Sequence, residues 1–545
     1  MYVRLKSSKQ SRNKTLQIVE GIREGKKVRQ RVIASLGTVN PENLEILHKL
    51  TENLIRKIEQ LGLKIPLKID LTNLLHTMTV YDGFGTVVNR MMELTGFSKI
   101  IRSAQGKRQF NLEEIVKLII TQRLDLPSSK RRTYERQEEH GFQEINLQHI
   151  YQAMDSIEHL SDAIQTQAFQ SVFSTANYLV DCFFFDVTTL YFESTVQNEL
   201  KDFGFSKDQK HHNVQIVLAL VVDKEGLPLA YETFKGNLAE TKTLIPVLQS
   251  LRNRFSIQNV TVVCDRGLAS QANIEALQEA QFHFVIASKL RSIAKKHQIN
   301  DPSQYTPLPN QDNIPKEEQV LFRTLEHPQY KDTLLIATYS PSRAAKDKQD
   351  RERLLEKLED KIGKSQNEKS IKKAISNSGY KKYTTIKTGS SIELNLSAIE
   401  KDAAWDGFHG IAVSNSAKLS ITEALARYRD LWHVEETFRI AKTTLKTRPI
   451  FHWNPCRIKS HILLCFMTLF IERFLELLLR QKGMPLTPDR IRHALSKLHT
   501  MHFKEAHTDR LGKMESSLNE DAEKIFKVLE MPTGRATGMI LNCCA

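Results

Sequence analysis

Two aspartates of this 545-residue chain stand at the ends of apolar runs that predict buried strands. Asp186 follows Cys182–Phe185, and Asp265 follows Val260–Cys264. A carboxylate at the end of a buried strand is costly unless a cation or a cap compensates it. Each aspartate alone is equally consistent with an ordinary turn residue at a strand exit. Two of them on neighbouring strands favour a shared divalent metal site, and a set of carboxylates selects Mg²⁺ or Mn²⁺ over zinc.

A third acidic ligand is expected on Ser420–Leu445, a segment without Gly or Pro that predicts one long helix. The residues that share one face of it, at about 100° per residue, are Tyr428, Trp432, Glu435, Arg439, Lys442 and Lys446. The apolar residues Leu431, Val434, Phe438, Ala441 and Leu445 share another face, which is expected to pack on a sheet. The alternative is a solvated face with ion pairs four residues apart. That alternative explains Trp432 less well, so Glu435 is the expected third ligand, with cations beside it for the phosphates of a nucleic acid strand.

The runs around these acids predict a mixed sheet covered by helices. Residues 179–290 read as β-β-β-α-β-α-β, with a hairpin first and a crossover connection later. Residues 291–404 break this rhythm with scattered Pro and a charged helix, and they predict an inserted, β-rich subdomain. Phe408–Val413 then resumes the core as a strand. Residues 80–178 and the tail from Pro455 read as helical, with a break near Gly483–Pro488.

Charge indicates a polyanionic partner. Lys and Arg number 78 against 63 Asp and Glu, giving a formal net charge of +15 on an ordinary globular composition. Residues 1–40 hold ten of these cations and two Glu. Within them Thr15–Gly37 alternates apolar and basic residues around Glu24-Gly25, which predicts a hairpin with a basic face, and a helix is expected over Pro41–Leu61. The basic stretch Ser128–Arg132 is equally consistent with a phosphate contact and with a solvated turn.

Several other classes of protein and site are excluded by the sequence. The longest apolar run, Ile462–Ile471, is about half of the roughly 20 residues that span a bilayer. The polar, basic start predicts no signal peptide. Six cysteines without C-x-x-C spacing indicate reduced thiols in a cytosolic protein and argue against a zinc site. His211-His212, His433 and His452 are expected to be neither ligands nor bases.

Longer motifs add a resemblance to a known family. The motifs are FFFDVTTLYFES, GFSKDQKHHNVQI, YETFKGNLAETKTL, VVCDRGLASQAN and YRDLWHVEETFRIAKTTLKTRPIFHW. Together, over residues 180–290 and 405–470, they resemble the bacterial insertion-sequence transposases that have an Asp-Asp-Glu site and a Tyr–Arg–Glu–Lys signature. The resemblance implies an α/β, ribonuclease-H-like fold with a mostly β insertion between the second Asp and the Glu. The gaps of 79 and 170 residues between the acids fit such an insertion.

The resemblance also implies a chemistry. Asp186, Asp265 and Glu435 become the catalytic, metal-binding acids, with two Mg²⁺ or Mn²⁺ ions as cofactors. Such a site cleaves phosphodiester bonds at the transposon ends and transfers the 3′-OH into target DNA. The implied partners are double-stranded DNA with terminal inverted repeats, target DNA, and a second copy of the chain or a larger synaptic complex. The implied location is the bacterial cytoplasm, at the nucleoid, with no membrane.

The DNA contacts follow the signature in part. Tyr428 and Lys442 match its Tyr and Lys, which are implied to contact the transposon end. Its Arg is absent, because Leu431 stands there; Arg439 is the expected replacement on the Glu435 face, although Arg429 is nearer in sequence. Further candidate contacts are Trp432 as a stacking platform for an extruded base, for which a residue of the insertion is an alternative, and Lys446, Arg266 and Lys207. Arg266 and Lys207 are equally consistent with structural roles.

The expected domain organisation has six parts. They are a basic hairpin and helix (1–75), a helical DNA-end-binding domain (76–178), the first part of the catalytic core (179–290), the inserted β-rich subdomain with its charged helix (291–404), the second part of the core with the Glu helix (405–470), and a C-terminal helical region (471–545). Two alternative functions are a metal nuclease of the same fold that only hydrolyses, and a DNA-binding protein that has lost catalysis. The basic N-terminal segment counts against the first, and three intact acids count against the second.

Overall fold

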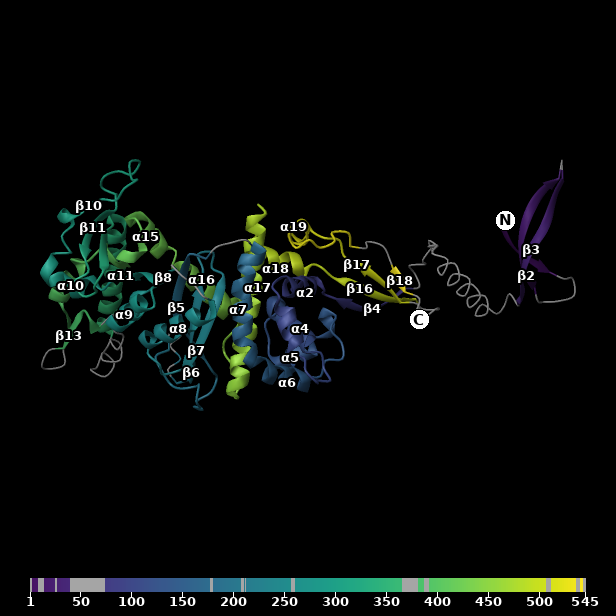
Figure 1. The fold of residues 1–545 in the computed structure, drawn as a ribbon, viewed down its shortest axis with the longest axis horizontal. Coiled ribbons are helices and arrows are strands. Elements are labelled where there is room, and N and C mark those ends of the chain that lie inside the picture. The colour runs from purple at the N-terminus through teal and green to yellow at the C-terminus, as the bar shows by residue number, and fades with distance from the viewer. Residues whose placement is uncertain are drawn as a thin grey trace. The chain divides into compact units, whose positions relative to one another are not determined.

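A nine-stranded mixed sheet carries the acidic residues (Figure 1), in the order β10-β11-β12-β15-β9-β8-β5-β6-β7. β5 (Cys182–Tyr191), β6 (Gln215–Val222) and β7 (Pro228–Lys235) are antiparallel neighbours. β8 (Thr261–Cys264) pairs in parallel with β5, and β9 (His283–Ala287) pairs in parallel with β8. The predicted mixed sheet, with its hairpin first and its crossovers later, is confirmed.

The apolar character of these strands matches their burial. Every residue of β6 and β8 is buried, as expected for strands that are covered on both faces. The parallel neighbours require crossover connections, which are supplied by α8 (Leu244–Phe255) and α9 (Gln271–Glu279). Helix α16 (Trp432–Arg439) packs against β5 and β6. The sheet therefore offers a rigid base for side chains at its strand ends.

This computed structural model describes residues 2–542 with the exception of 8–13, 25–26, 40–73, 177–179, 207–209, 211, 256–259, 365–380, 387–391, 506–510 and 536–539. The chain divides into two units. The larger unit comprises Val80–His499 and Ser516–Arg535, and the smaller one comprises Met1–Thr79, Thr500–Glu515 and Ala536–Ala545. All of the candidate catalytic residues belong to the larger unit.

The smaller unit contains two sheets. β1 (Tyr2–Ser7), β2 (Lys14–Glu24) and β3 (Lys27–Val39) form one, and the register of β2 and β3 closes at Glu24 opposite Lys27. The predicted hairpin is confirmed, with β1 as a third strand. The helix expected over Pro41–Leu61 lies outside the described residues.

The second sheet corrects the prediction of an all-helical tail. It has the order β18-β17-β16-β4, with the strands β4 (Leu74–Val80), β16 (Thr500–Glu505), β17 (Leu511–Glu515) and β18 (Ile540–Asn542). Strand β16 alternates apolar and polar residues, with Met501 and Phe503 two positions apart. An alternation this short is a weak strand signal next to the long helical run that precedes it. In addition, β16 pairs with β4, which is distant in the sequence.

A region of helices in the larger unit contacts the sheet at β7, through α7 (Ser161–Ala176) and α17 (Pro455–Gln481). The helices of this region are α2 (Gly83–Leu94), α3 (Phe97–Ser103), α4 (Leu112–Asp125), α5 (Lys130–Glu135), α6 (Leu147–Ile157) and α7, followed much later by α17, α18 (Pro488–Ser496) and α19 (Glu520–Val528). Helix α17 contacts α4, α6, α7 and β7, so it joins the helical region to the sheet (Figure 1). The helical prediction for residues 80–178 and the break after α17 are confirmed. In the part of the chain that the structure describes, no helix has the length and apolarity needed to cross a bilayer.

The insertion is mixed and not mostly β in its described residues. Its elements are α10 (Leu290–His297), β10 (Thr306–Pro307), β11 (Leu321–Glu326), β12 (Thr333–Tyr339), α11 (Pro341–Lys364), β13 (Thr384–Ile386), β14 (Ile392–Leu394) and α14 (Leu396–Ala403). Its longest element is the predicted charged helix, α11, which has ion pairs four residues apart such as Arg343–Asp347. Strand β12 pairs with β15 (Phe408–Ser414), so the insertion extends the core sheet.

The segment expected as one helix is divided into three. It forms α15 (Ile421–Arg429), α16, and the π-helical turn η8 (Ile440–Thr444). Between α15 and α16 the backbone bonds tighten to the i−3 carbonyl, from Leu431 N to Tyr428 O (3.2 Å) and from His433 N to Asp430 O (3.0 Å). This tight turn accompanies the burial of Leu431. The predicted apolar face is nevertheless confirmed, because Leu431, Val434, Phe438, Ala441 and Leu445 are all buried.

Candidate active site

The two aspartates occupy equivalent positions on neighbouring parallel strands. Phe185 of β5 lies opposite Cys264 of β8, so Asp186 and Asp265 are the next residues of the two strands. Asp265 directly follows the last residue of β8, as predicted, and it is exposed. Asp186 does not end β5, which corrects the prediction. The ladder to β8 stops before Asp186, whereas the ladder to β6 continues as far as Tyr191.

The buried thiol of Cys264 lies within the electrostatic influence of both carboxylates. Burial raises the pKa of Cys264 well above its usual value, and the negative charges of Asp186 and Asp265 raise it further. The two acids therefore act on the same buried atom from adjacent strand positions. Two carboxylates at adjacent positions of neighbouring strands are an arrangement that can bind a cation.

Glu435 reaches this region from α16. Its side chain is exposed, while Val434 beside it is buried and directs the helix onto the sheet. The pKa of Tyr428 is raised to about 12, chiefly by burial and then by Asp265, with Glu435 adding a smaller contribution. Because both acids raise the pKa of one phenol, Tyr428 lies in the field of the strand-end site and of the helix acid at once.

The donor set fits a hard divalent cation in its chemistry. All three side chains are carboxylates, and no hydrogen bond or ion pair of the carboxylates of Asp265 and Glu435 occurs among the described residues. In the same described part, no three His, Cys, Asp or Glu side chains converge to ligate one ion. Asp186 and Asp265 nevertheless follow directly paired residues of neighbouring strands. The residues therefore fit the metal by type and by strand register.

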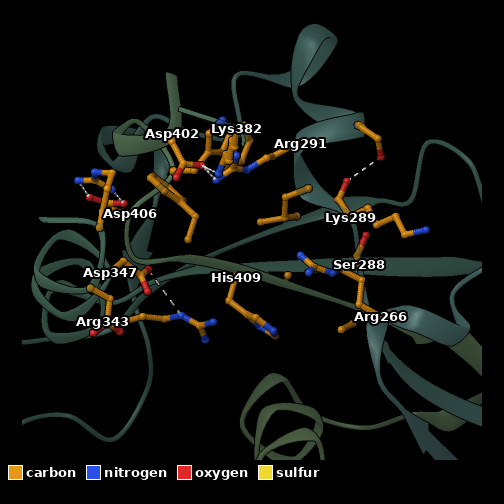
Figure 2. Close-up of a pocket in the computed structure, with 18 of the residues that line it drawn as sticks. Arg266, Ser288, Lys289, Arg291, Arg343, Asp347, Lys382, Asp402, Asp406 and His409 are labelled. Atoms are coloured by element: carbon orange, nitrogen blue, oxygen red, sulfur yellow. Dashed lines mark hydrogen bonds and ion pairs between the residues drawn. The ribbon is translucent and has the colours of Figure 1, made fainter. Parts of the chain in front are cut away.

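A pocket of about 880 Å³ opens beside Asp265, between the core strands and the insertion. Figure 2 shows Arg343 and Asp347 on one side, Ser288 and Arg266 on the other, and His409 between them. Tyr428 also lines it. The pocket is large enough to admit part of a nucleic acid strand, and it places cations of two separate chain segments next to a candidate catalytic acid.

The insertion side of this pocket is held by buried ion pairs. Arg351 donates two parallel hydrogen bonds to Asp406, at 2.5 and 2.6 Å, and both side chains are mostly buried. Asp402 accepts bonds from Lys382, Tyr383 and Arg291. Burial alone would raise the pKa of Asp402, but these bonds outweigh it and lower the pKa to about 2. The charges on this wall therefore compensate one another.

The remaining residues expected to contact DNA are distributed unevenly. Arg266 lies beside Asp265 and lines the large pocket. Arg439 is exposed and forms an ion pair of 3.5 Å with Glu436, whereas Lys442 is half-buried on η8. Trp432 is 49% exposed, as a stacking platform requires. Lys446 lines a second, separate pocket, Arg429 is exposed, and Lys207 lies outside the described residues.

Sequence reasoning missed two residues of the large pocket. His409 packs its ring against Tyr428, with the ring centroids 5.0 Å apart, and burial together with Arg343 and Arg266 lowers the pKa of His409 to about 4. Its imidazole is therefore neutral and can donate one hydrogen bond. Arg343 comes from α11, far along the chain from both acids, and no local spacing relates it to them. The only available signal was the position of His409 at the start of a core strand.

Three comparisons with known proteins extend these observations. Residues 181–471, more than half of the chain, match the family profile described as the transposase DDE domain. Residues 3–62 match that of the N-terminal domain of IS1634 family transposases. Among solved structures, the chain is similar to piggyBac transposase in a cryo-EM synaptic complex with hairpin DNA, at 9% identity and a TM-score of 0.36 over 76% of this chain and 80% of that one. No curated protein sequence matches the chain.

Proposed function

The chain belongs to the DDE transposases, in the IS1634 family by its N-terminal match, and on this premise we propose that Asp186, Asp265 and Glu435 are its catalytic acids. The resemblance is thereby confirmed, as is the function of cleaving and joining DNA strands, and the predicted mixed sheet is observed. The observation that carries the proposal is the register of β5 and β8, which sets Asp186 and Asp265 side by side.

Each acid has a part that follows from its position. Asp186 and Asp265 come from rigid, buried strands, so they define the fixed side of a metal site. Glu435 comes from helix α16, which packs on β5 and β6, and we assign it as the third ligand. We place two Mg²⁺ or Mn²⁺ ions on these three carboxylates. When bound, such ions activate water and stabilise the leaving 3′ oxygen of an in-line attack on a phosphodiester.

The surrounding residues position the DNA. Arg266 follows Asp265 directly and holds the phosphate next to the scissile one, while neutral His409 and Tyr428 can each donate one hydrogen bond. Arg439 takes the place of the signature's missing Arg, and Lys442 keeps its Lys. Trp432 supplies an aromatic face for an unstacked base.

The substrate and the assembly follow from this arrangement. We propose that the DNA is the pair of terminal inverted repeats that flank the element, joined afterwards to target DNA by a dimer or a larger synaptic complex at the bacterial nucleoid. We assign end recognition to the helical domain, residues 76–178, and to the basic segment of residues 1–75. Ten cations in residues 1–40 support the second assignment, because phosphate contacts dominate DNA affinity.

A gel assay with labelled inverted-repeat DNA and Mg²⁺ tests the function. Wild-type protein should give strand-transfer products joined to target DNA. Nicking without joining would support a nuclease instead, and a shifted band without cleavage would support a DNA-binding protein that has lost catalysis.

The decisive variant is Glu435→Gln, which removes the charge and keeps the shape of the side chain. It should abolish strand cleavage and retain end binding. Glu423→Gln is the matched control, because Glu423 belongs to the N-terminal capping box of α15 and Gln also serves in that motif. Cleavage by the Glu435→Gln protein at the wild-type rate would refute the assignment.

A further inference from the structure

A second pocket, of about 210 Å³, lies where the helical domain meets the end of the Glu-bearing segment. Its walls come from the α4–α5 connection and from the turn after η8. The residues that line it are Arg123, Pro127, Ser128, Ser129, Lys130, Tyr151, Lys446, Arg448, Pro449, Phe451, His452 and His461. Four of them are cations, and no Asp or Glu occurs among the lining residues in the described part of the chain.

Lys130 is the most unusual of these cations. Only 4% of the residue is exposed, and its ammonium group has no ion pair or hydrogen bond with any described residue. Burial, and then the nearby charge of Arg123, lowers the pKa of Lys130 to about 7. A buried, unpaired lysine beside an arginine is destabilising for the free protein, so its position needs a reason outside the fold.

Other buried donors in the same pocket also lack partners. The Nε of Arg123 and the hydroxyl of Ser128 are buried and make no hydrogen bond with described residues. Most buried polar groups in proteins have a partner. Several unpartnered donors around one cavity, together with its cations, indicate a ligand that is negatively charged and rich in acceptor atoms.

The histidines contribute no charge, and one of them can donate a hydrogen bond. Burial lowers the pKa of His452 to about 3, with Lys130, Arg457 and Arg123 lowering it further. Burial lowers the pKa of His461 as well. A neutral imidazole has one donor, and that of His461 is Nε2–H, which already donates to the carbonyl of Thr447 at 3.0 Å, so only His452 can offer a donor to the pocket. The nearest carboxylate acting on His452 is that of Asp155, which is already paired with Arg457 at 2.7 Å and does not line the pocket.

The pocket is tied to the Glu-bearing segment by backbone contacts. Arg123 donates from Nη1 to the carbonyl of Leu445 at 2.7 Å, directly before Lys446. Lys446 adopts a left-handed backbone conformation, with φ of 46°, which turns the chain out of η8 and into the pocket wall. A DNA strand that follows the cations from Glu435 along this segment therefore arrives at the pocket.

We infer that this pocket binds a backbone phosphate of the DNA, held by Lys130, Arg123 and Lys446 with Arg448 at its rim. The inference rests on the proposed function, since it concerns the DNA that the acids cleave. On this inference both roles considered for the stretch Ser128–Arg132 occur, a phosphate contact at one residue and a solvated turn at others. Lys130 faces the pocket, whereas Arg131 and Arg132 are exposed and pair with Glu135.

The test measures DNA affinity against salt concentration, with a duplex carrying the inverted repeat, without divalent metal, and below pH 7 so that Lys130 is protonated. Each phosphate contact contributes about 0.9 to the slope of log K against log salt. Lys130→Met should lower that slope by about 0.9 and weaken binding equally for specific and random duplexes. Arg131→Met, with the same change of charge one residue further along, should leave the slope unchanged.

Phosphate neutralisation identifies the contact. In duplexes with one methylphosphonate at a time, the wild-type protein should lose affinity at one position where the Lys130→Met protein loses none. A slope for Lys130→Met equal to that of the wild type, or additive losses at every position, would overturn the inference.

A further arm separates DNA from free anions. Inorganic phosphate should raise the melting temperature of the wild-type protein, relative to chloride at equal ionic strength, more than that of Lys130→Met. If phosphate shows this difference while the DNA slopes are equal, the pocket is a free-anion site and the DNA assignment is wrong. None of these measurements depends on DNA cleavage. A result that refutes the phosphate pocket can therefore be distinguished from one that refutes the catalytic acids.

Discussion

The two pockets of the larger unit contain charges of very different kinds. In the pocket beside Asp265, each of the other aspartates that line it has a cation as partner, as in the pairs Arg351–Asp406 and Arg343–Asp347. In the pocket around Lys130, cations face one another without any lining carboxylate in the described residues. The paired charges of the large pocket therefore need no ligand to compensate them on the insertion side. The unpaired cations of the small pocket lower the stability of the free protein. Uncompensated charge, and not size, marks the place where an anion binds.

The largest effect is expected in the large pocket. Arg351→Met leaves Asp406 mostly buried without its two parallel hydrogen bonds. Loss of one partner of a buried pair destabilises a protein by about 3–5 kcal/mol. Urea unfolding of the larger unit should show a loss of this size. A change below about 1 kcal/mol, the size typical of exposed pairs, would mean that the insertion wall is not held by this pair, and the contrast between the pockets would fail.

Features that depend on residues close together in the sequence could be predicted from it. The positions of Asp186, Asp265 and Glu435 follow from apolar runs and helix periodicity, since each depends on residues within a few positions. The apolar face of α16 and η8 was predicted correctly even though the expected single helix is divided at Asp430–Leu431. Local patterns therefore predicted the central sheet, and they supply the three acids of the proposed site.

What could not be predicted depends on contacts between distant segments. The small pocket requires Arg123 to meet the backbone of Leu445, and no spacing in the sequence relates two residues so far apart. The strands β16 and β17 were missed for a similar reason, because their sheet is completed by β4 from the other end of the chain. The same applies to Arg343 at the large pocket.

The second prediction is a change in the free energy of unfolding that is opposite in sign to the first. Lys130→Met removes a cation from a buried pocket, as Arg351→Met does, yet it should stabilise the protein by about 1–2 kcal/mol near pH 7, because it relieves an unpaired buried charge. Urea unfolding measures the gain. A loss of stability would show that Lys130 has a partner in the folded protein and would remove the basis of the comparison.

The pH dependence of this gain sharpens the comparison further. Folding lowers the pKa of Lys130 from 10.5 to about 7, so between these values the unfolded chain binds a proton that the folded chain does not. Stability of the wild-type protein therefore rises with pH across that window. The advantage of Lys130→Met should be full below pH 7 and should shrink as the pH rises towards 10. An advantage that is constant with pH would assign it to packing instead of charge.

The smallest effect is expected one residue away. Arg131 is 79% exposed in its side chain and pairs with Glu135 at 3.2 Å on the same helix. An exposed pair four residues apart contributes about 0.3–0.5 kcal/mol, so Arg131→Met should change the free energy of unfolding by no more than that, with no pH dependence between 7 and 10. If Lys130→Met stabilises the protein and Arg131→Met does not, the difference between these neighbouring cations comes from the burial of Lys130 without a partner. If Arg131→Met stabilised the protein as much as Lys130→Met does, general repulsion among the cations of this basic chain would explain both, and the pocket would have no special status.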